Sequence, residues 1–205
     1  MHRAILVCER RFRRVQVRLQ LGFERVSIVG FSMGAGVAAH YAALHPTRVA
    51  RLALVDYAPR NEDGGVERLI ASIELSWPSF EAAVDQMCAF NARRTRANIV
   101  ERLSHSLRCD TSVTPPLWRF KIDPALVRAM RERVKSADVR DDGWSTLARI
   151  EAPTLVVRGA QSELFDAATA ARVCSTLRRA SLVTIDDSSH TVPGDQPIKF
   201  AAAGE

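Results

Sequence analysis

Residues 30–34 read GFSMG, a serine between two glycines, and this segment is the part of the chain best suited to covalent chemistry. An apolar run at 26–29 precedes it and a helix-like segment at 35–44 follows it. A serine at such a strand-to-helix turn is typical of a nucleophile elbow, whose glycines let strand and helix approach closely. The turn would place the backbone N–H of Met33 at a helix N-terminus, facing the oxyanion formed when Ser32 attacks a carbonyl. The alternative is a structural turn serine, because the pattern also arises by chance.

A serine nucleophile needs a base, most often histidine, and the chain has five histidines. Four occupy unfavourable positions: His2 is terminal, His40 and His45 lie on or just after the helix that follows the serine, and His105 lies in the central region. His190 follows the last predicted strand, which matches the chain order serine, acid, histidine. The sequence therefore predicts His190 as the base, against the alternative of an ordinary surface histidine.

The acid that orients this histidine has three candidates. Glu163 lies in the loop after the predicted strand at 154–157, where an acid late in the chain is expected. Asp56 ends an earlier predicted strand and has the shorter, stiffer side chain, which makes it the alternative acid. Asp166, three residues after the favoured glutamate, is the third candidate. The order of the elements favours Glu163.

The elements around these residues alternate between strand and helix. Strands are predicted at 25–30, 49–56, 154–157 and 181–185, and helices at 33–44 and 166–177. Short continuous apolar runs joined by helices indicate a mostly parallel α/β sheet. Between residues 60 and 150 the spacing is helical instead, at 65–75, 79–92, 97–107 and 125–136, with no predicted strand.

This central region is therefore predicted to be a helical cap inserted into the α/β core. We expect its aromatic side chains to form a core of the cap rather than to contact substrate, although either role suits each of them. These side chains are Trp77, Phe80, Phe90, Trp118 and Phe120.

Bulk composition excludes several classes of function. The net charge of +6 is local, because residues 1–22 contain six arginines and one glutamate, and no aromatic residues are interleaved as base stacking requires. Nucleic acid is therefore not an expected partner. The four cysteines lack metal-ligand spacing, so neither a metal nor a disulfide framework is predicted. No apolar run is long enough to cross a bilayer, and we expect a cytoplasmic protein with no membrane partner.

Taken together, the motifs resemble the α/β-hydrolase fold superfamily, and most of all its capped bacterial ester and lactone hydrolases. The matching segments are 26–44, 49–59, 152–164 and 188–197. The resemblance implies one domain with a core at 23–60 and 148–205, a helical cap at 61–147 and a basic N-terminal segment at 1–22. It also implies the triad roles for Ser32, Glu163 and His190, an oxyanion donor in Met33, no cofactor, and a small ester or lactone as substrate.

The sequence departs from this family before the elbow strand. Members usually carry several strands there, with a loop that supplies a second oxyanion N–H, whereas only 24 residues precede Arg25 and no His-Gly pair occurs. We therefore expect an N-terminally truncated sheet whose strand at 26–29 is an exposed edge, open to pairing in a homodimer. Residues 15–21 could form a hairpin strand or a helix, and the resemblance favours the helix.

Two other functions remain open from the sequence. One is a weakly active or non-catalytic remnant that serves as an interaction module, because loss of an oxyanion donor costs about 10² to 10³ in turnover. The other is a lyase or perhydrolase that uses the same triad.

Overall fold

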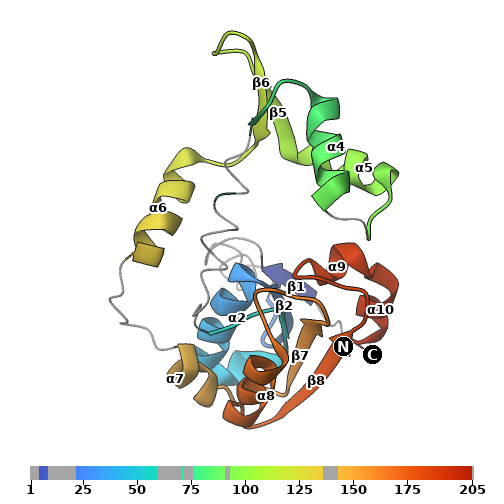
Figure 1. Cartoon of the computed structure of the whole chain (residues 1–205). Helices are drawn as coiled ribbons and strands as arrows, with labels where there is room; N and C mark the ends of the chain where they lie inside the picture. Colours follow the sequence, from blue (N-terminus) through green and yellow to red (C-terminus); the bar gives the residue numbers. More distant parts are fainter. Residues whose placement is uncertain are drawn as a thin grey trace. The chain divides into compact units, whose positions relative to one another are not determined.

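The computed structural model describes residues 5–8, 22–59, 71, 76–90, 93–135 and 143–204. It divides into two compact units (Figure 1). Residues 1–63 and 140–205 form the first unit, and residues 64–139 form the second. The segment 15–21, predicted as a helix or a hairpin strand, and most of the arginine-rich segment lie outside the described residues. Of the predicted helix at 65–75, the structure describes only residue 71, which is helical.

The first unit contains a five-stranded parallel sheet in the order β1-β2-β3-β7-β8. Its strands are β1 (Ile5–Cys8), β2 (Val26–Phe31), β3 (Val49–Val55), β7 (Thr154–Gly159) and β8 (Ala180–Ile185). The mostly parallel α/β sheet predicted from the short apolar runs is therefore confirmed. Because all five strands run in one direction, the loops that follow them leave the sheet at the same edge.

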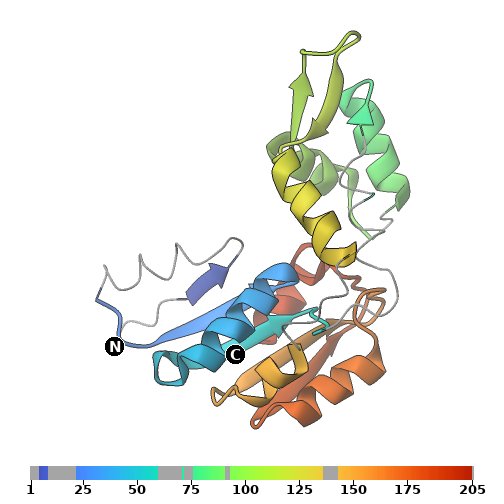
Figure 2. The ribbon, with the colours of Figure 1, turned by 90° about the vertical axis from the view of Figure 1, so that its left-hand side faces the viewer.

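Helices cover both faces of this sheet (Figures 1 and 2). On one face α2 (Met33–Leu44) packs against β2 and β3, α8 (Ala167–Thr176) packs against β7 and β8, and α7 (Gly143–Ala148) contacts both helices. Two short helices, α9 (Val192–Asp195) and α10 (Pro197–Ala202), follow β8. A short 3₁₀ turn, Pro46–Arg48, joins α2 to β3, where His45 and Pro46 end the helix.

Alternate residues of β2, β3 and β7 point into two separate hydrophobic clusters, as the twofold period of a strand requires. The cluster under α2, α7 and α8 contains Val26, Ile28, Leu52, Leu54 and Val156. The cluster on the other face joins Val55, Val157 and Ile185 to Val192 of α9, with Phe200 of α10 packed against it. Burial on both faces explains why these strands read as continuous apolar runs.

The prediction of an exposed edge at 26–29 is wrong. Strand β1 pairs with β2 in parallel, placing Ile5 beside Ser27 and Cys8 beside Gly30. The backbone of β2 is therefore paired on both sides, with β1 and β3. Among the described strands the edges are β1 and β8, so the expected homodimer has no open edge at β2 to use.

The described part of the second unit contains helices and a small antiparallel sheet. Its helices are α4 (Phe80–Phe90), α5 (Arg96–Ser106) and α6 (Pro124–Lys135). Strands β4 (Ser76–Trp77), β5 (Leu107–Asp110) and β6 (Leu117–Phe120) pair in the order β4-β6-β5. The expectation of helices alone is therefore wrong, because strands of two to four residues are too short to show a clear twofold period.

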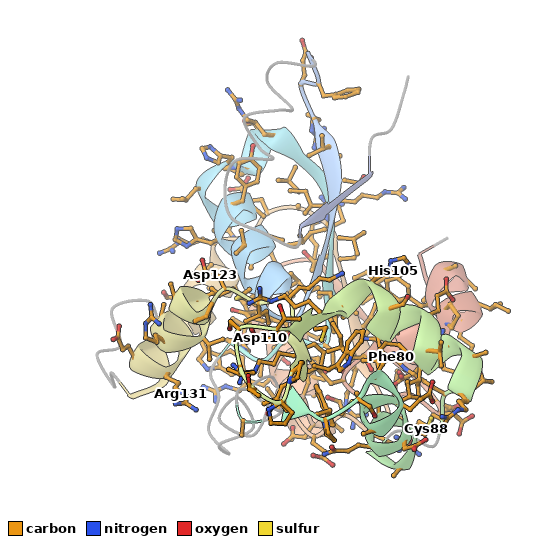
Figure 3. All side chains as sticks on the ribbon, turned by 90° about the horizontal axis from the view of Figure 1, so that it is seen from above. Phe80, Cys88, His105, Asp110, Asp123 and Arg131 are labelled. Carbon is orange, nitrogen blue, oxygen red and sulfur yellow. The ribbon has the colours of Figure 1, made fainter. Side chains whose placement is uncertain are left out.

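The aromatic residues of the second unit pack together. The ring of Trp77 lies edge-on to Phe120 at 5.6 Å between centroids, and Phe80 lies edge-on to Trp118 at 5.2 Å. Figure 3 shows Phe80 and Cys88 on α4 and His105 on α5, the two helices that pack beside this small sheet. These four aromatic rings belong to the core of the unit, and the side chain of Phe90 lies outside the described residues.

In the part of the chain that the structure describes, no helix is long and apolar enough to cross a membrane.

Candidate active site

Ser32 lies at the turn between β2 and α2, in a backbone conformation that L-residues rarely adopt. Its φ is 51° and its ψ is −123°. The turn is held because the Ser32 N–H donates to the carbonyl of Val55 at 2.9 Å, and the Ser32 carbonyl accepts from the N–H of Ala35 at 2.9 Å. A non-glycine residue in this region carries strain that the surrounding structure must overcome, and such residues cluster at functional sites.

Gly30 provides the space that this turn needs. A Cβ atom built on Gly30 would lie 2.6 Å from the Cα of Ala35 and 2.7 Å from the carbonyl oxygen of Gly34. Both neighbours are backbone atoms of the turn and of α2, so neither can move aside cheaply. The close approach of strand and helix expected at this glycine is therefore present.

His190 reaches Ser32 from the loop after β8. Its Nε2 lies 2.9 Å from the Oγ of Ser32, although 158 residues separate the two in sequence. The ring of Phe31, the residue before the serine, packs against the imidazole with 5.0 Å between centroids. The structure therefore brings together the predicted nucleophile and the predicted base.

A buried carboxylate holds the loop on both sides of His190. Asp195, at the end of α9, accepts hydrogen bonds from the backbone N–H and the hydroxyl of Ser189 and from the hydroxyl of Thr191. On the side of β7, the carbonyl of Ser188 accepts from the N–H of Gln161 at 2.9 Å. These bonds tie the residues before and after His190 to the body of the unit.

The acid beside His190 is Asp56, so the choice of Glu163 from the sequence is corrected. The Nδ1 of His190 lies 2.8 Å from the Oδ1 of Asp56, whose side chain is fully buried. Glu163 is exposed. Asp166 begins α8 as its N-cap, where its side chain accepts from the N–H of Thr169 at 2.6 Å. This backbone hydrogen bond lowers the pKa of Asp166, which fits a capping residue.

Strand order explains the correction. Strand β3, which Asp56 follows, is the direct neighbour of β2, whereas β7 lies one strand further from the serine. Adjacent strands are about 4.8 Å apart, so the short aspartate at the end of β3 is already close to the elbow. Asp56 adopts a φ of 48°, and its N–H donates to the carbonyl of Val157 at 2.8 Å. This second turn with a positive φ directs the carboxylate of Asp56 toward His190.

The loop from which Glu163 was expected to act supplies two hydrogen-bond donors to Asp56 instead. The N–H of Gly159 donates to Oδ2 at 2.9 Å, and the hydroxyl of Ser162 donates to Oδ1 at 2.6 Å. Neither of these two residues, nor Asp195, was predicted from the sequence. A glycine directly at the end of a strand is a signal for close backbone approach and could have indicated Gly159.

Gly159 is also where the loop that carries His190 comes closest to β7. A Cβ at this position would collide with the carbonyl oxygen of Ser189 and would lie 2.8 Å from that of Ser188. Gly159→Ala should therefore displace this loop and lower the free energy of unfolding by about 1–3 kcal/mol. Urea unfolding measures the effect. The control is Gly204→Ala, whose Cβ would meet only Ala201 at 3.5 Å. Equal stability of the two variants would contradict this prediction.

Met33, the predicted oxyanion donor, is the first residue of α2. The first N–H groups of a helix have no carbonyl partner within the helix, so the Met33 N–H is placed at the positive end of α2 beside the serine. The described residues do not identify a second oxyanion donor, and the chain between β1 and Gly22 lies outside them.

Together, the hydroxyl, the imidazole and the carboxylate form an unbroken chain of hydrogen bonds within the first unit. Such a chain can move the hydroxyl proton of Ser32 to His190 while the buried Asp56 carboxylate holds the imidazole in one tautomer. None of the three side chains needs a metal ion for this chemistry.

The chain is similar to known proteins in both sequence and structure. A curated relative, the 3-hydroxybutyrate-oligomer hydrolase of Cupriavidus necator, is 28% identical over 191 residues, which cover 90% of this chain and 65% of the relative. The chain thus spans slightly less than two thirds of that relative's length.

Solved structures share the fold. E-2-(acetamidomethylene)succinate hydrolase superposes with a TM-score of 0.74 at 21% identity, covering 93% of this chain and 69% of that one. An alpha/beta hydrolase from Novosphingobium aromaticivorans gives a TM-score of 0.72 at 23% identity, with coverage of 92% and 67%. An esterase from Mycobacterium tuberculosis gives 0.65 at 23% identity, with coverage of 92% and 62%.

The family model described as alpha/beta hydrolase fold matches residues 9–197, which is most of the chain. This match includes the elbow at Ser32, Asp56 and the loop of His190. The chain therefore belongs to the alpha/beta hydrolase fold family.

Proposed function

We propose that this protein is a serine hydrolase that cleaves a small carboxylic ester or lactone. Ser32 is the nucleophile, His190 the general base and Asp56 the acid that orients it. The observation that carries the proposal is the pair of hydrogen bonds to His190, at 2.9 Å from Ser32 and 2.8 Å from Asp56. A surface histidine with no chemical role would not need a fully buried carboxylate behind it.

In the proposed reaction, the Oγ of Ser32 attacks the ester carbonyl while Nε2 of His190 takes the hydroxyl proton. The new oxyanion accepts a hydrogen bond from the backbone N–H of Met33, at the positive end of α2. The imidazolium, stabilised by Asp56, then donates its proton to the leaving alkoxide, and an acyl-enzyme remains. A water molecule, deprotonated by His190, attacks the acyl carbon, and the carboxylic acid leaves as Ser32 recovers its proton.

The names of related proteins support this reaction class. One curated relative is named a 3-hydroxybutyrate-oligomer hydrolase, and one protein of the same fold is named an esterase. Both names describe hydrolysis. Hydrolysis is also the reaction that we propose for this chain, with a carboxylic ester or lactone as the substrate class. No cofactor is needed for it.

A fluorophosphonate probe tests the proposal, because it phosphonylates a serine that an adjacent base activates. We expect a single label on the folded 205-residue chain, located on Ser32 by peptide mass mapping, together with hydrolysis of short p-nitrophenyl esters. Ser181→Ala is the matched control, since Ser181 is an exposed serine on β8, and it should label like the wild type. A folded sample that shows neither labelling nor ester hydrolysis would contradict the proposal. If the protein instead formed a peracid with hydrogen peroxide, or cleaved a carbon–carbon bond, the result would favour a perhydrolase or a lyase.

A further inference from the structure

The hydroxyl of Ser162 contacts the Asp56 carboxylate at the same oxygen that contacts His190. The Oδ1 of Asp56 accepts from the hydroxyl of Ser162 at 2.6 Å and contacts Nδ1 of His190 at 2.8 Å. The other oxygen, Oδ2, accepts from the N–H of Gly159 at 2.9 Å. Three donors therefore surround a carboxylate that solvent does not reach, and Ser162 is the one whose role neither the fold nor the proposed reaction explains.

The proton of this hydroxyl has a defined direction. Ser162 is 8% exposed, and its Oγ accepts a hydrogen bond from the N–H of Leu164 at 3.2 Å. An ionised carboxylate only accepts hydrogen bonds, so the single hydroxyl proton points to Asp56. A hydrogen bond of this kind, to a charged and buried acceptor, is among the stronger ones in proteins.

The loop around Ser162 has backbone and side-chain bonds that do not involve this hydroxyl. The N–H of Ser162 donates to the carbonyl of Gly159 at 3.0 Å, and the N–H of Gln161 donates to the carbonyl of Ser188. The guanidinium of Arg158 spans the loop and donates to the carbonyl of Phe165 at 2.8 Å and to that of Ala160 at 3.0 Å. These bonds should hold the path of the loop when the hydroxyl is removed, even though the N–H of Leu164 then loses its acceptor.

We propose that Ser162 is a positioning residue that holds the Asp56 carboxylate in the orientation that His190 requires. This inference rests on the proposed triad. Without the hydroxyl, Oδ1 would face an apolar side chain with one of its two partners lost, which is costly for a buried charge. The carboxylate then turns toward the remaining donor at Gly159, and its hydrogen bond to His190 opens more often. Ser162 thus acts on the base through the acid and does not touch substrate.

Ser162→Thr and Ser162→Val test this role, because the two new side chains have nearly the same shape and only threonine keeps the hydroxyl. For ester hydrolysis we expect kcat to fall about tenfold more in the valine variant than in the threonine variant, with KM nearly equal in both. Urea unfolding of both variants checks that they fold. Equal turnover of two folded variants would overturn the proposal.

A spectroscopic measurement keeps this test independent of activity. The Nδ1–H proton of His190, held against a carboxylate, should give a low-field proton NMR signal in the full chain, identified by its loss in Asp56→Asn. We expect the signal to persist in Ser162→Thr and to be lost through exchange with water in Ser162→Val. Persistence in both variants would overturn the role of Ser162. Absence of fluorophosphonate labelling in the wild type would instead contradict the proposed function, and the NMR comparison would still decide the role of Ser162.

Discussion

Replacing Ser32 with alanine should lower kcat for ester hydrolysis by about 10⁶-fold, to the level that binding and oxyanion stabilisation alone can support. In the proposed reaction the hydroxyl oxygen forms the acyl bond, so its loss removes the covalent route altogether. His190→Ala should cost about as much, because a hydroxyl without a base is a poor nucleophile at neutral pH. Steady-state hydrolysis of a p-nitrophenyl ester, with fluorophosphonate labelling of the same samples, measures both variants.

The double variant sharpens this test. In the proposed mechanism the two side chains, joined by the 2.9 Å contact between Nε2 and Oγ, act as one unit. Ser32→Ala combined with His190→Ala should therefore be no slower than either single variant. Ser181→Ala should keep full activity, and thermal unfolding should show that all variants fold. Independent, multiplicative losses from the two substitutions would show that the serine and histidine do not act together.

The second large effect concerns the acid. Asp56→Asn should lower kcat by about 10⁴-fold, since an amide in place of the carboxylate permits the wrong imidazole tautomer and cannot stabilise the imidazolium. Glu163→Gln should leave kcat within about twofold of the wild type, as surface substitutions away from a site usually have small effects. Glu163 is the matched control because it lies only one residue from Ser162, yet is exposed.

Kinetics of the two variants, measured with the same ester, separate the two acids. A large loss of kcat in Glu163→Gln with little change in Asp56→Asn would contradict the assignment of Asp56 and favour Glu163 as the acid. Urea unfolding of Asp56→Asn is needed beside the kinetics, because the carboxylate also accepts hydrogen bonds from Gly159 and Ser162.

Local patterns predicted the core elements closely. The helix predicted at 33–44 is α2, and the strand predicted at 49–56 ends one residue earlier, at Val55. The local sequence is enough to predict these elements, because apolar runs bounded by glycine, proline and charged residues are compatible with few other secondary structures. The elbow was predictable for the same reason, since Gly30, Ser32 and the helix after them are contiguous.

Pairing between distant segments was harder to predict. Strand β1 is only four residues long and lies before an arginine-rich segment, so the sequence shows no sign that Ile5–Cys8 pairs with β2. The antiparallel sheet of the second unit was missed in the same way, because its strands are short and their pairing joins residues 76–77, 107–110 and 117–120. In both cases the stabilising hydrogen bonds come from another segment.

The sequence by itself determined the chemical inventory: a serine on a turn that requires glycine, and a histidine in a loop near the end of the chain. Tertiary structure alone decided which carboxylate completes the group, because that depends on β3 being the neighbour of β2 in the sheet. It also decided that the loop after β7 provides donors to this acid, through Gly159 and Ser162. The physical reason is distance: a hydrogen bond needs atoms about 3 Å apart, and only the order of strands in space brings residues 32, 56, 162 and 190 within that range.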